Sequence, residues 1–390
     1  MLRKIFATLV IVTLMFTFNF ETTKVVANTN PDQPLINTKG KSSLLMEYTT
    51  GKIIFAKNEH EKMYPASMTK MVGMHLVLNA IKDGKIDWED DVQVSSKAAS
   101  MGGTQIFLQP GEVMKVKDLF KSVAINSAND AMFALGELVG GSEENFIKMM
   151  NDFVREIGLK NTNFANIVGF DDENHYSTAY DMAIIGRTLL GHGDTILNFT
   201  KIYDSYVRED TSSPFWLVNT NKLVKFYNGM DGLKTGFTQK SKYCLTATAK
   251  RDNLRFIAVS MGNNTIQERS QDITTMLNYG FANYSAIKVY QQGEVIDTLH
   301  IEDAKRPKVP IIVTDNIYMV VRKGEKLDSL KARIEYVKNS SPIAEREVVG
   351  KLIIKNSDNW EARFDVVTAV KVEQLTFWDL FIKTLQECLF

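Results

Sequence analysis

A serine and a lysine three positions apart are the first residues in this chain that could carry out chemistry together. Ser67 and Lys70 stand in Pro65-Ala-Ser-Met-Thr-Lys70, at the start of the apolar segment 68–81. Where a helix begins, side chains at this spacing share a face and can touch. A serine hydroxyl is a poor nucleophile unless an adjacent base takes its proton, and an unprotonated lysine can act as that base. Because burial favours the unprotonated form, the segment predicts a serine nucleophile activated by a lysine.

Two shorter polar segments follow this pair. Ser127-Ala-Asn129 lies inside a stretch of helical spacing, and Lys234-Thr-Gly236 precedes a strand pattern. Each has a plain structural interpretation, because serine and asparagine often interrupt helices and Lys-Thr-Gly suits a polar turn that enters a strand. The occurrence of S-x-x-K, S-x-N and K-T-G in this order is nevertheless hard to attribute to chance. We therefore interpret the three segments as parts of one site.

The elements that must position these segments alternate between helix and strand. A hairpin is expected across Thr49-Thr-Gly51, and two adjacent buried strands at 243–249 and 254–260. Helical spacing of apolar residues covers 68–81, 116–138, 143–157 and 181–190. Strands at both ends with helices between them predict an α+β domain over residues 28–285, in which distant segments close the sheet.

Beyond residue 285 the sequence changes to short β-rich runs separated by Gly, Pro, Asn or Asp. The runs are 287–290, 311–313, 317–321, 331–337, 351–354 and 364–370. No long helix fits before residue 374. This pattern predicts a small all-β sandwich domain over residues 286–373.

The final residues, 374–390, form a separate amphipathic element. At about 100° per residue, aromatic and aliphatic side chains such as Phe377, Trp378 and Phe381 gather on one face. The segment is too short to span a bilayer. We expect a helix that lies on the membrane surface, and a helix docked on the protein's own core is the alternative.

The first 27 residues have the pattern of a secretory signal. Arg3 and Lys4 precede an uncharged apolar run at 5–18, and Val25-Val-Ala27 supplies small residues at a cleavage position. An uncleaved anchor is the alternative interpretation. We expect the mature protein to be exported and to act at the outer face of the cytoplasmic membrane.

Composition excludes several classes of function. The 46 basic and 46 acidic residues give zero formal net charge, which gives no support for nucleic-acid binding. The two cysteines, Cys244 and Cys388, are too few for a disulfide scaffold or a structural zinc site. The five histidines show no metal-binding spacing, and the G-x-S-x-G motif is missing from the sequence. We expect neither a metal nor an organic cofactor.

The three motifs resemble the set found in penicillin-binding proteins and class A β-lactamases. Among these, the chain resembles the low-molecular-mass penicillin-binding proteins that are serine-type D-alanyl-D-alanine carboxypeptidases. The likeness extends to segments 65–71, 103–108, 110–112, 127–131, 158–164, 175–179 and 181–183. It covers essentially the whole mature chain, and the late β domain and amphipathic C-terminal helix also match. The resemblance implies a β-lactamase/transpeptidase-like first domain, with helices flanking a sheet.

The resemblance also implies roles for the catalytic residues. Ser67 would attack the carbonyl of the penultimate D-alanine in a peptidoglycan stem peptide ending in D-Ala-D-Ala, and would expel the terminal residue. Lys70 would be the acylation base, and Ser127 would relay a proton to the leaving amine. Backbone N–H groups of Ser67 and Phe237 would form the oxyanion hole. β-Lactam antibiotics would acylate Ser67.

Binding roles follow in the same way. Asn129 would hold the substrate amide and position Lys70, while Lys234 would keep the site electropositive and Thr235 would bind the terminal carboxylate. Gly236 completes the motif. One departure concerns Ser241-Lys-Tyr243, where the family usually has small residues, often Ala-Gly. This difference bears on fine specificity.

Three alternatives stay open at this point. A class A-like β-lactamase would need a deacylating glutamate in E-x-x-L-N, and no such motif occurs between Asn129 and Lys234. Endopeptidase or transpeptidase activity would use the same residues. A non-catalytic peptidoglycan-binding scaffold would keep the fold, but it would have no need of the intact motifs.

Overall fold

The computed structural model describes residues 36–389. Its first part contains a five-stranded antiparallel sheet with the order β2-β1-β9-β8-β7. The strands are β1 (Ser42–Glu47), β2 (Ile53–Lys57), β7 (Met230–Thr238), β8 (Lys242–Arg251) and β9 (Leu254–Asn263). Strand β1 pairs with β9, so the predicted joining of distant segments in one sheet is confirmed. The predicted export signal lies outside the described residues.

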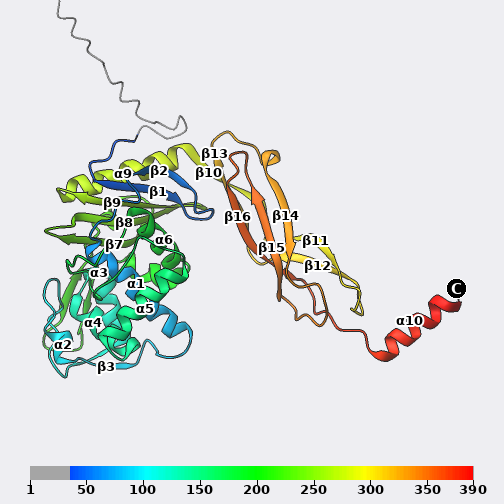
Figure 1. Cartoon of the computed structure of the whole chain (residues 1–390), viewed down its shortest axis with the longest axis horizontal. Helices are drawn as coiled ribbons and strands as arrows, with labels where there is room; N and C mark the ends of the chain where they lie inside the picture. The colour runs from blue at the N-terminus through cyan, green and yellow to red at the C-terminus, as the bar shows by residue number, and fades with distance from the viewer. Residues whose placement is uncertain (1–35, 390) are drawn as a thin grey trace, which may run out of the picture. The chain divides into compact units, whose positions relative to one another are not determined.

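Helices cover both faces of this sheet (Figure 1). In β1, Leu44 and Met46 belong to the core shared with the main helical layer, whereas Leu45 packs in a second core with Ile273 and Met276 of α9 (Ile266–Asn283). This division follows from the alternation of side chains along a strand. Both faces are apolar because both are covered.

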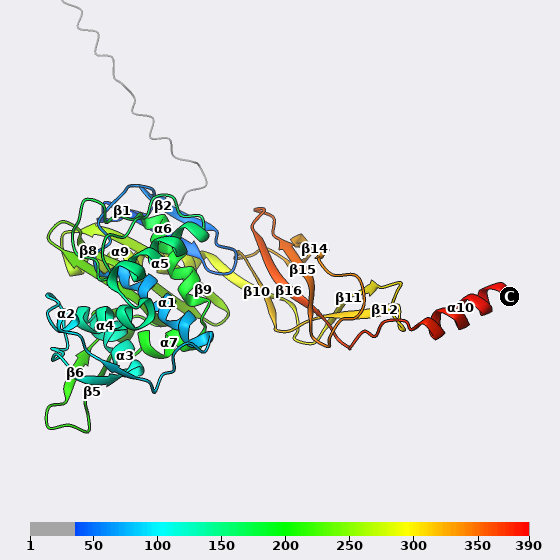
Figure 2. The same cartoon turned by 60° about the horizontal axis from the view of Figure 1, so that its bottom comes forward.

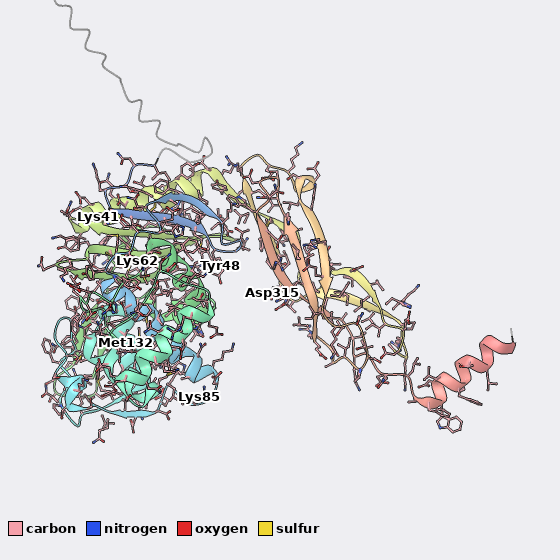
Figure 3. The ribbon with its side chains drawn as sticks, in the orientation of Figure 1. Lys41, Tyr48, Lys62, Lys85, Met132 and Asp315 are labelled. Carbon is pink, nitrogen blue, oxygen red and sulfur yellow. The ribbon has the colours of Figure 1, made fainter. Side chains whose placement is uncertain are left out.

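The main helical layer carries the first two motifs. It contains α1 (Lys70–Lys82), α3 (Val116–Asn126), α4 (Asn129–Gly140), α5 (Glu143–Glu156) and α6 (Ala179–Leu190). Helices α1 and α4 approach closely at Gly73, where a β-carbon would lie 2.7 Å from the sulfur of Met132; Figure 3 labels Met132 within this layer. Such close packing fixes the two helices that carry Lys70 and Asn129.

Short elements complete the first part. They are the 3-10 turn η1 (Ala66–Thr69), α2 (Ser96–Ala99), α7 (Asp194–Thr200), α8 (Leu223–Phe226) and the paired strands β3 (Asp91–Gln93) with β4 (Val113–Lys115) and β5 (Asp204–Val207) with β6 (Phe215–Val218). The hairpin β5–β6 projects beyond the helices in the turned view (Figure 2). Strand β6 leads into residues 218–220, which line the cleft described below.

The structure corrects two details of the sequence interpretation. The helix predicted over 116–138 is two helices, because Ser127 adopts φ 68° and ends α3. A left-handed residue cannot continue an α-helix. The K-T-G segment is no turn before a strand, because Lys234 and Gly236 are central residues of β7, paired with Thr246 and Cys244.

The long helix α9 was not predicted from the sequence. Helix α9 follows β9, and the side chain of Thr265 caps its first turn by accepting a hydrogen bond from the backbone of Glu268. The T-x-x-E capping pattern and the apolar spacing of Ile273, Met276 and Leu277 were signals for it. Arg269 of this helix lines the cleft that contains Ser67.

The β-rich part has two antiparallel sheets, as the predicted sandwich requires. One pairs β10 (Tyr284–Tyr290) with β13 (Ile317–Arg322), and the other has the order β11-β12-β16-β15-β14. Its strands are β11 (Val295–His300), β12 (Lys308–Val313), β14 (Lys331–Tyr336), β15 (Val348–Lys355) and β16 (Glu361–Thr368), with a 3-10 turn η2 (Leu327–Ser329). Strand β11 was not predicted because most of its residues are exposed, so it lacks apolar alternation.

Helix α10 (Phe377–Leu389) ends the described chain. Thr376 and Asp379 cap each other's backbone N–H groups at its start. Phe377 and Trp378 are 71% and 67% exposed. Within residues 36–389, no helix is long and apolar enough to cross a membrane.

Candidate active site

The side chains of Ser67 and Lys70 meet at the junction of η1 and α1. The Lys70 amine donates to Ser67 Oγ at 2.8 Å and to the backbone carbonyl of Val168 at 2.9 Å. Lys70 is fully buried, whereas Ser67 is partly exposed and lines a cleft. The arrangement places a serine hydroxyl at the surface and a buried amine within hydrogen-bond distance of it.

The surroundings of Lys70 favour its neutral form. Burial lowers the pKa of the amine well below its usual value, and the positive charge of Lys234 lowers it further, while Asp130 partly opposes both. Burial is the largest of these three influences on the pKa. A neutral amine at hydrogen-bond distance from a hydroxyl can accept its proton.

The second motif lies at the break between α3 and α4. Ser127 is buried, and its left-handed conformation places it on the wall of the cleft. Asn129 begins α4 and donates from Nδ2 to the Gly102 carbonyl at 2.6 Å. Its Oδ1 is buried and, among the described residues, lacks a hydrogen-bond partner. A buried acceptor without a partner is costly, and a substrate N–H group could satisfy it.

The third motif forms the strand side of the cleft. Lys234 is buried, and its amine donates to the Thr235 carbonyl at 3.1 Å. Burial, together with the charge of Arg269, lowers the pKa of Lys234 to about 7. Thr235 donates from its hydroxyl to Thr220 Oγ1 at 2.7 Å, and the exposed Phe237 stacks on Tyr243.

Two glycines allow the strand and a loop to press against the nucleophile's turn. A β-carbon at Gly236 would lie 2.7 Å from the Pro65 carbonyl oxygen, and one at Gly169 would lie 2.0 Å from that of Ala66. Gly169 also has φ 97°, which residues with side chains rarely adopt. The turn that carries Ser67 is therefore in contact with β7 on one side and with the loop 166–171 on the other.

The cleft between these elements has a volume of about 390 Å³. Its lining includes Ser67, Thr104, Ser127, Thr235, Phe237 and Arg269. The structure thus brings together residues of all three motifs. It also adds Arg269 of α9, which the sequence analysis missed together with its helix.

Arg269 is an unusual guanidinium because it is 4% exposed and, among the described residues, its Nε has no hydrogen-bond partner. Burial lowers its pKa to about 10. Buried arginines are ordinarily paired with an acid. Arg269, which lines the cleft, and Lys234, which adjoins the lining residue Thr235, therefore give the cleft a positive charge suited to an anionic ligand.

Two other candidates serve the structure. His175 accepts from the Ala165 backbone at Nδ1 and contacts the Thr69 hydroxyl through Nε2 at 2.8 Å. Burial lowers its pKa to about 4, so it holds the 165–175 loop to η1 as a neutral ring. Cys244 is buried and burial raises its pKa to about 11, which disfavours the reactive thiolate.

The departure at Ser241-Lys-Tyr243 includes a residue with positive φ. Lys242 has φ 56°, the region that glycine adopts most easily. Its side chain is exposed. The turn therefore tolerates lysine at a position where the resembled family usually has a smaller residue.

Comparison with known proteins gives a consistent set of relatives. Residues 24–265 match the model of the D-alanyl-D-alanine carboxypeptidase family Peptidase_S11, and residues 284–374 match the C-terminal domain of penicillin-binding protein 5. The chain is 42% identical over 348 residues to the D-alanyl-D-alanine carboxypeptidase DacF of Bacillus subtilis, covering 89% of each chain. It is 31% identical to DacA of Escherichia coli, covering 83% of this chain and 80% of DacA.

Solved structures agree with these matches. Penicillin-binding protein 5 from Haemophilus influenzae superimposes with a TM-score of 0.69 at 31% identity, covering 87% of this chain and 98% of that one. Penicillin-binding protein D2 from Listeria monocytogenes in its ampicillin-bound form gives 0.58 at 26% identity, covering 64% of this chain and all of that one. The likeness to the first structure spans both the α+β part and the β-rich part.

Proposed function

The chain belongs to the D-alanyl-D-alanine carboxypeptidase family, and on this premise we propose that it removes the terminal D-alanine from peptidoglycan stem peptides through an acyl-enzyme on Ser67. The observation that carries the proposal is the buried Lys70 amine, 2.8 Å from Ser67 Oγ in a cationic cleft. The geometry supplies a nucleophile, its base and a place for a carboxylate.

Acylation begins with proton transfer within this pair. The neutral Lys70 amine accepts the hydroxyl proton as Ser67 Oγ bonds to the carbonyl carbon of the penultimate D-alanine. The backbone N–H groups of Ser67 and Phe237 are assigned to the oxyanion that forms. The C–N bond then breaks, and Ser127 relays the proton held by Lys70 to the leaving D-alanine amine.

Hydrolysis of the ester reverses the proton flow. Lys70 regains its neutral form and accepts a proton from water, whose oxygen attacks the acyl carbon. Ser67 leaves with its proton restored, and the shortened peptide is released. One residue thus acts as the base in both half-reactions.

Substrate binding is assigned to the orphan groups of the cleft. The buried Asn129 Oδ1 would accept the N–H of the substrate amide. The terminal carboxylate would bind Thr235 and Arg269, with Lys234 adding positive potential. A charged hydrogen bond to the carboxylate would favour substrates with a free C-terminus.

β-Lactams should react with the same serine, because their strained amide resembles the scissile bond. The relative from Listeria monocytogenes was solved with ampicillin bound. The decisive experiment treats intact protein and Ser67→Ala with a labelled penicillin, and measures D-alanine released from a peptide ending in Lys-D-Ala-D-Ala. We expect label and release only with the intact protein. Absence of covalent label on the intact protein would favour a scaffold.

The same peptide, offered with an amine acceptor, separates the reactions that share this site. Hydrolysis releases D-alanine and a shortened acid, whereas transpeptidation joins the peptide to the amine. We expect water to be the main acceptor. Predominant transfer would reassign the enzyme as a transpeptidase.

We further propose that the protein is exported and that α10 attaches it to the outer surface of the cytoplasmic membrane. Phe377, Trp378, Phe381 and Ile382 are each at least 48% exposed, which suits insertion at a lipid interface. Deletion of residues 376–390 should move the protein from the membrane fraction to the soluble fraction. Retention in the membrane fraction would contradict the anchor.

A further inference from the structure

The loop 166–171 has a function that the three motifs do not explain. Its Val168 carbonyl accepts the second hydrogen bond of the Lys70 amine, at 2.9 Å. The acceptor is a backbone atom, so its position depends entirely on how the loop is held. A displacement of this carbonyl would leave the amine free to turn away from Ser67.

One end of the loop is held by its own side chain. Asn166 Oδ1 accepts from the backbone N–H groups of Gly169 and Phe170 at 2.8 and 3.0 Å, and Nδ2 donates to the Phe170 carbonyl. These bonds shape the turn around Gly169. They do not attach it to the rest of the site.

Ile167 and Val168 pack in the main core, and His175 holds the neighbouring segment to η1. The attachment of the loop to β7 comes from Asp171. Thr238 at the end of β7 donates from Oγ1 to Asp171 Oδ1 at 2.6 Å, across a separation of 67 residues. Thr238 is itself fixed, because Oγ1 accepts from the Ser241 backbone at 2.9 Å and its N–H donates to the buried Ser241 Oγ at 2.7 Å. The loop is thus tied to the strand that carries Lys234, Thr235 and the Phe237 N–H.

We propose that Asp171 is a positioning residue: through Thr238 it fixes the loop 166–171 to β7, and so keeps the Val168 carbonyl where it orients the Lys70 amine toward Ser67. The proposal rests on the carboxypeptidase function proposed above. It assigns the exposed acid a role in turnover and none in substrate binding. The proposed function assigns the carboxylate of the substrate to Thr235 and Arg269 and not to Asp171.

The test compares variants that keep or remove the hydrogen bond. Asp171→Ala and Thr238→Val remove it, whereas Asp171→Asn keeps an acceptor oxygen and Thr238→Ser keeps the hydroxyl. Asp172→Ala is the matched control, because it removes an equal charge from the adjacent exposed position and, with it, a local hydrogen bond from the Asn174 N–H but, among the described residues, no hydrogen bond to β7. Each variant is assayed for kcat and KM with the peptide ending in Lys-D-Ala-D-Ala.

We expect Asp171→Ala and Thr238→Val each to lower kcat about tenfold with KM changed less than about twofold, since a small misplacement of a catalytic group is costly. Asp171→Asn, Thr238→Ser and Asp172→Ala should keep kcat within about threefold of the unaltered enzyme. The double variant Asp171→Ala/Thr238→Val should be no slower than the slower single variant, because both remove one interaction.

Three results would overturn the proposal: equal kcat for Asp171→Ala and Asp172→Ala, failure of Asp171→Asn to rescue, or additive losses in the double variant. If Asp171→Ala does not fold, Thr238→Val against Thr238→Ser gives the same comparison. The activity of the unaltered enzyme distinguishes failure of the proposed function from failure of the positioning role. If it releases no D-alanine, the proposed function fails; if it is active and Asp171→Ala matches it, only this positioning role fails.

Discussion

The α+β part and the β-rich part of this protein treat charge in opposite ways. In the first, Lys70 and Lys234 are fully buried and Arg269 nearly so, and the Nε of Arg269 has no hydrogen-bond partner among the described residues. In the second, charged side chains such as Lys351 and Asp365 pair on the exposed faces of the strands. Buried cations cost stability and gain reactivity, whereas exposed pairs contribute little to either. Burial of basic side chains alone therefore points to the candidate site in the α+β part.

The largest expected effect comes from removing the base. Lys70→Ala should lower acylation by labelled penicillin by roughly 10³-fold or more, because the serine loses its proton acceptor. The fold should persist, as measured by circular dichroism and a cooperative thermal transition. Acylation at the normal rate would show that the buried amine is not the base and would remove the main support for the comparison.

A smaller loss is expected from the guanidinium of α9. Arg269→Gln should raise the KM of the peptide ending in D-Ala-D-Ala by about 10- to 100-fold, because a charged hydrogen bond to the carboxylate is lost. A matched peptide ending in D-Ala-D-Ala amide lacks that carboxylate. It should be turned over equally by Arg269→Gln and the unaltered enzyme, and a loss with both peptides would assign Arg269 to the fold instead.

Lys234 should show the stability cost of the site directly. Burial lowers its pKa to about 7, below the value in the unfolded chain. Between about pH 7 and 10 the unfolded chain therefore binds more protons than the folded protein. The free energy of unfolding thus rises with pH across that window. Lys234→Met should therefore raise the free energy of unfolding by roughly 1–3 kcal/mol at pH 7, and the gain should shrink toward pH 10. Denaturant titrations at the two pH values measure it.

The same substitution of Lys234 should lower activity although it raises stability. Lys234→Met should weaken peptide binding even though it stabilises the fold, because the cleft loses positive potential. A variant that was both more stable and fully active would break the link between buried charge and function. A variant that was less stable at pH 7 would show that the amine's bond to the Thr235 carbonyl outweighs its desolvation.

The smallest effect is expected in the β-rich part. Lys351→Ala removes one partner of an exposed pair with Asp365 and should change the free energy of unfolding by less than about 1 kcal/mol. Release of D-alanine should be unchanged. A loss of several kcal/mol, measured by the same denaturant titrations, would mean that charge pairing stabilises this sheet far more than the comparison allows.

The sequence predicted which motif residues come together better than it predicted how they are held. Ser67, Lys70 and Ser127 are recognisable by residue type and spacing, because the sequence specifies reactive side chains directly. The contribution of the Val168 carbonyl cannot be recognised in this way, because every residue has a backbone carbonyl. Only the fold determines which carbonyl contacts Lys70. Arg269 was missed for a different reason, because its helix was not identified although its cap and apolar spacing were present.

Fold prediction succeeded where pattern and burial agree. The hairpin of β1 and β2 and the buried strands β8 and β9 follow from local apolar patterns. The division of the predicted 116–138 helix at Ser127 could not be read from its periodicity, because apolar spacing continues into α4. Tertiary contacts around the cleft, and not local preference, stabilise the left-handed residue.

The backbone conformation of Ser127 sets a stability cost against its proposed role. Its φ of 68° is a conformation that glycine adopts freely and that costs a residue with a β-carbon about 1 kcal/mol. Glycine, however, has no hydroxyl to line the cleft. If Ser127 relays the proton as proposed, Ser127→Gly would relieve the backbone and remove the relay, so thermal stability and turnover would change in opposite directions.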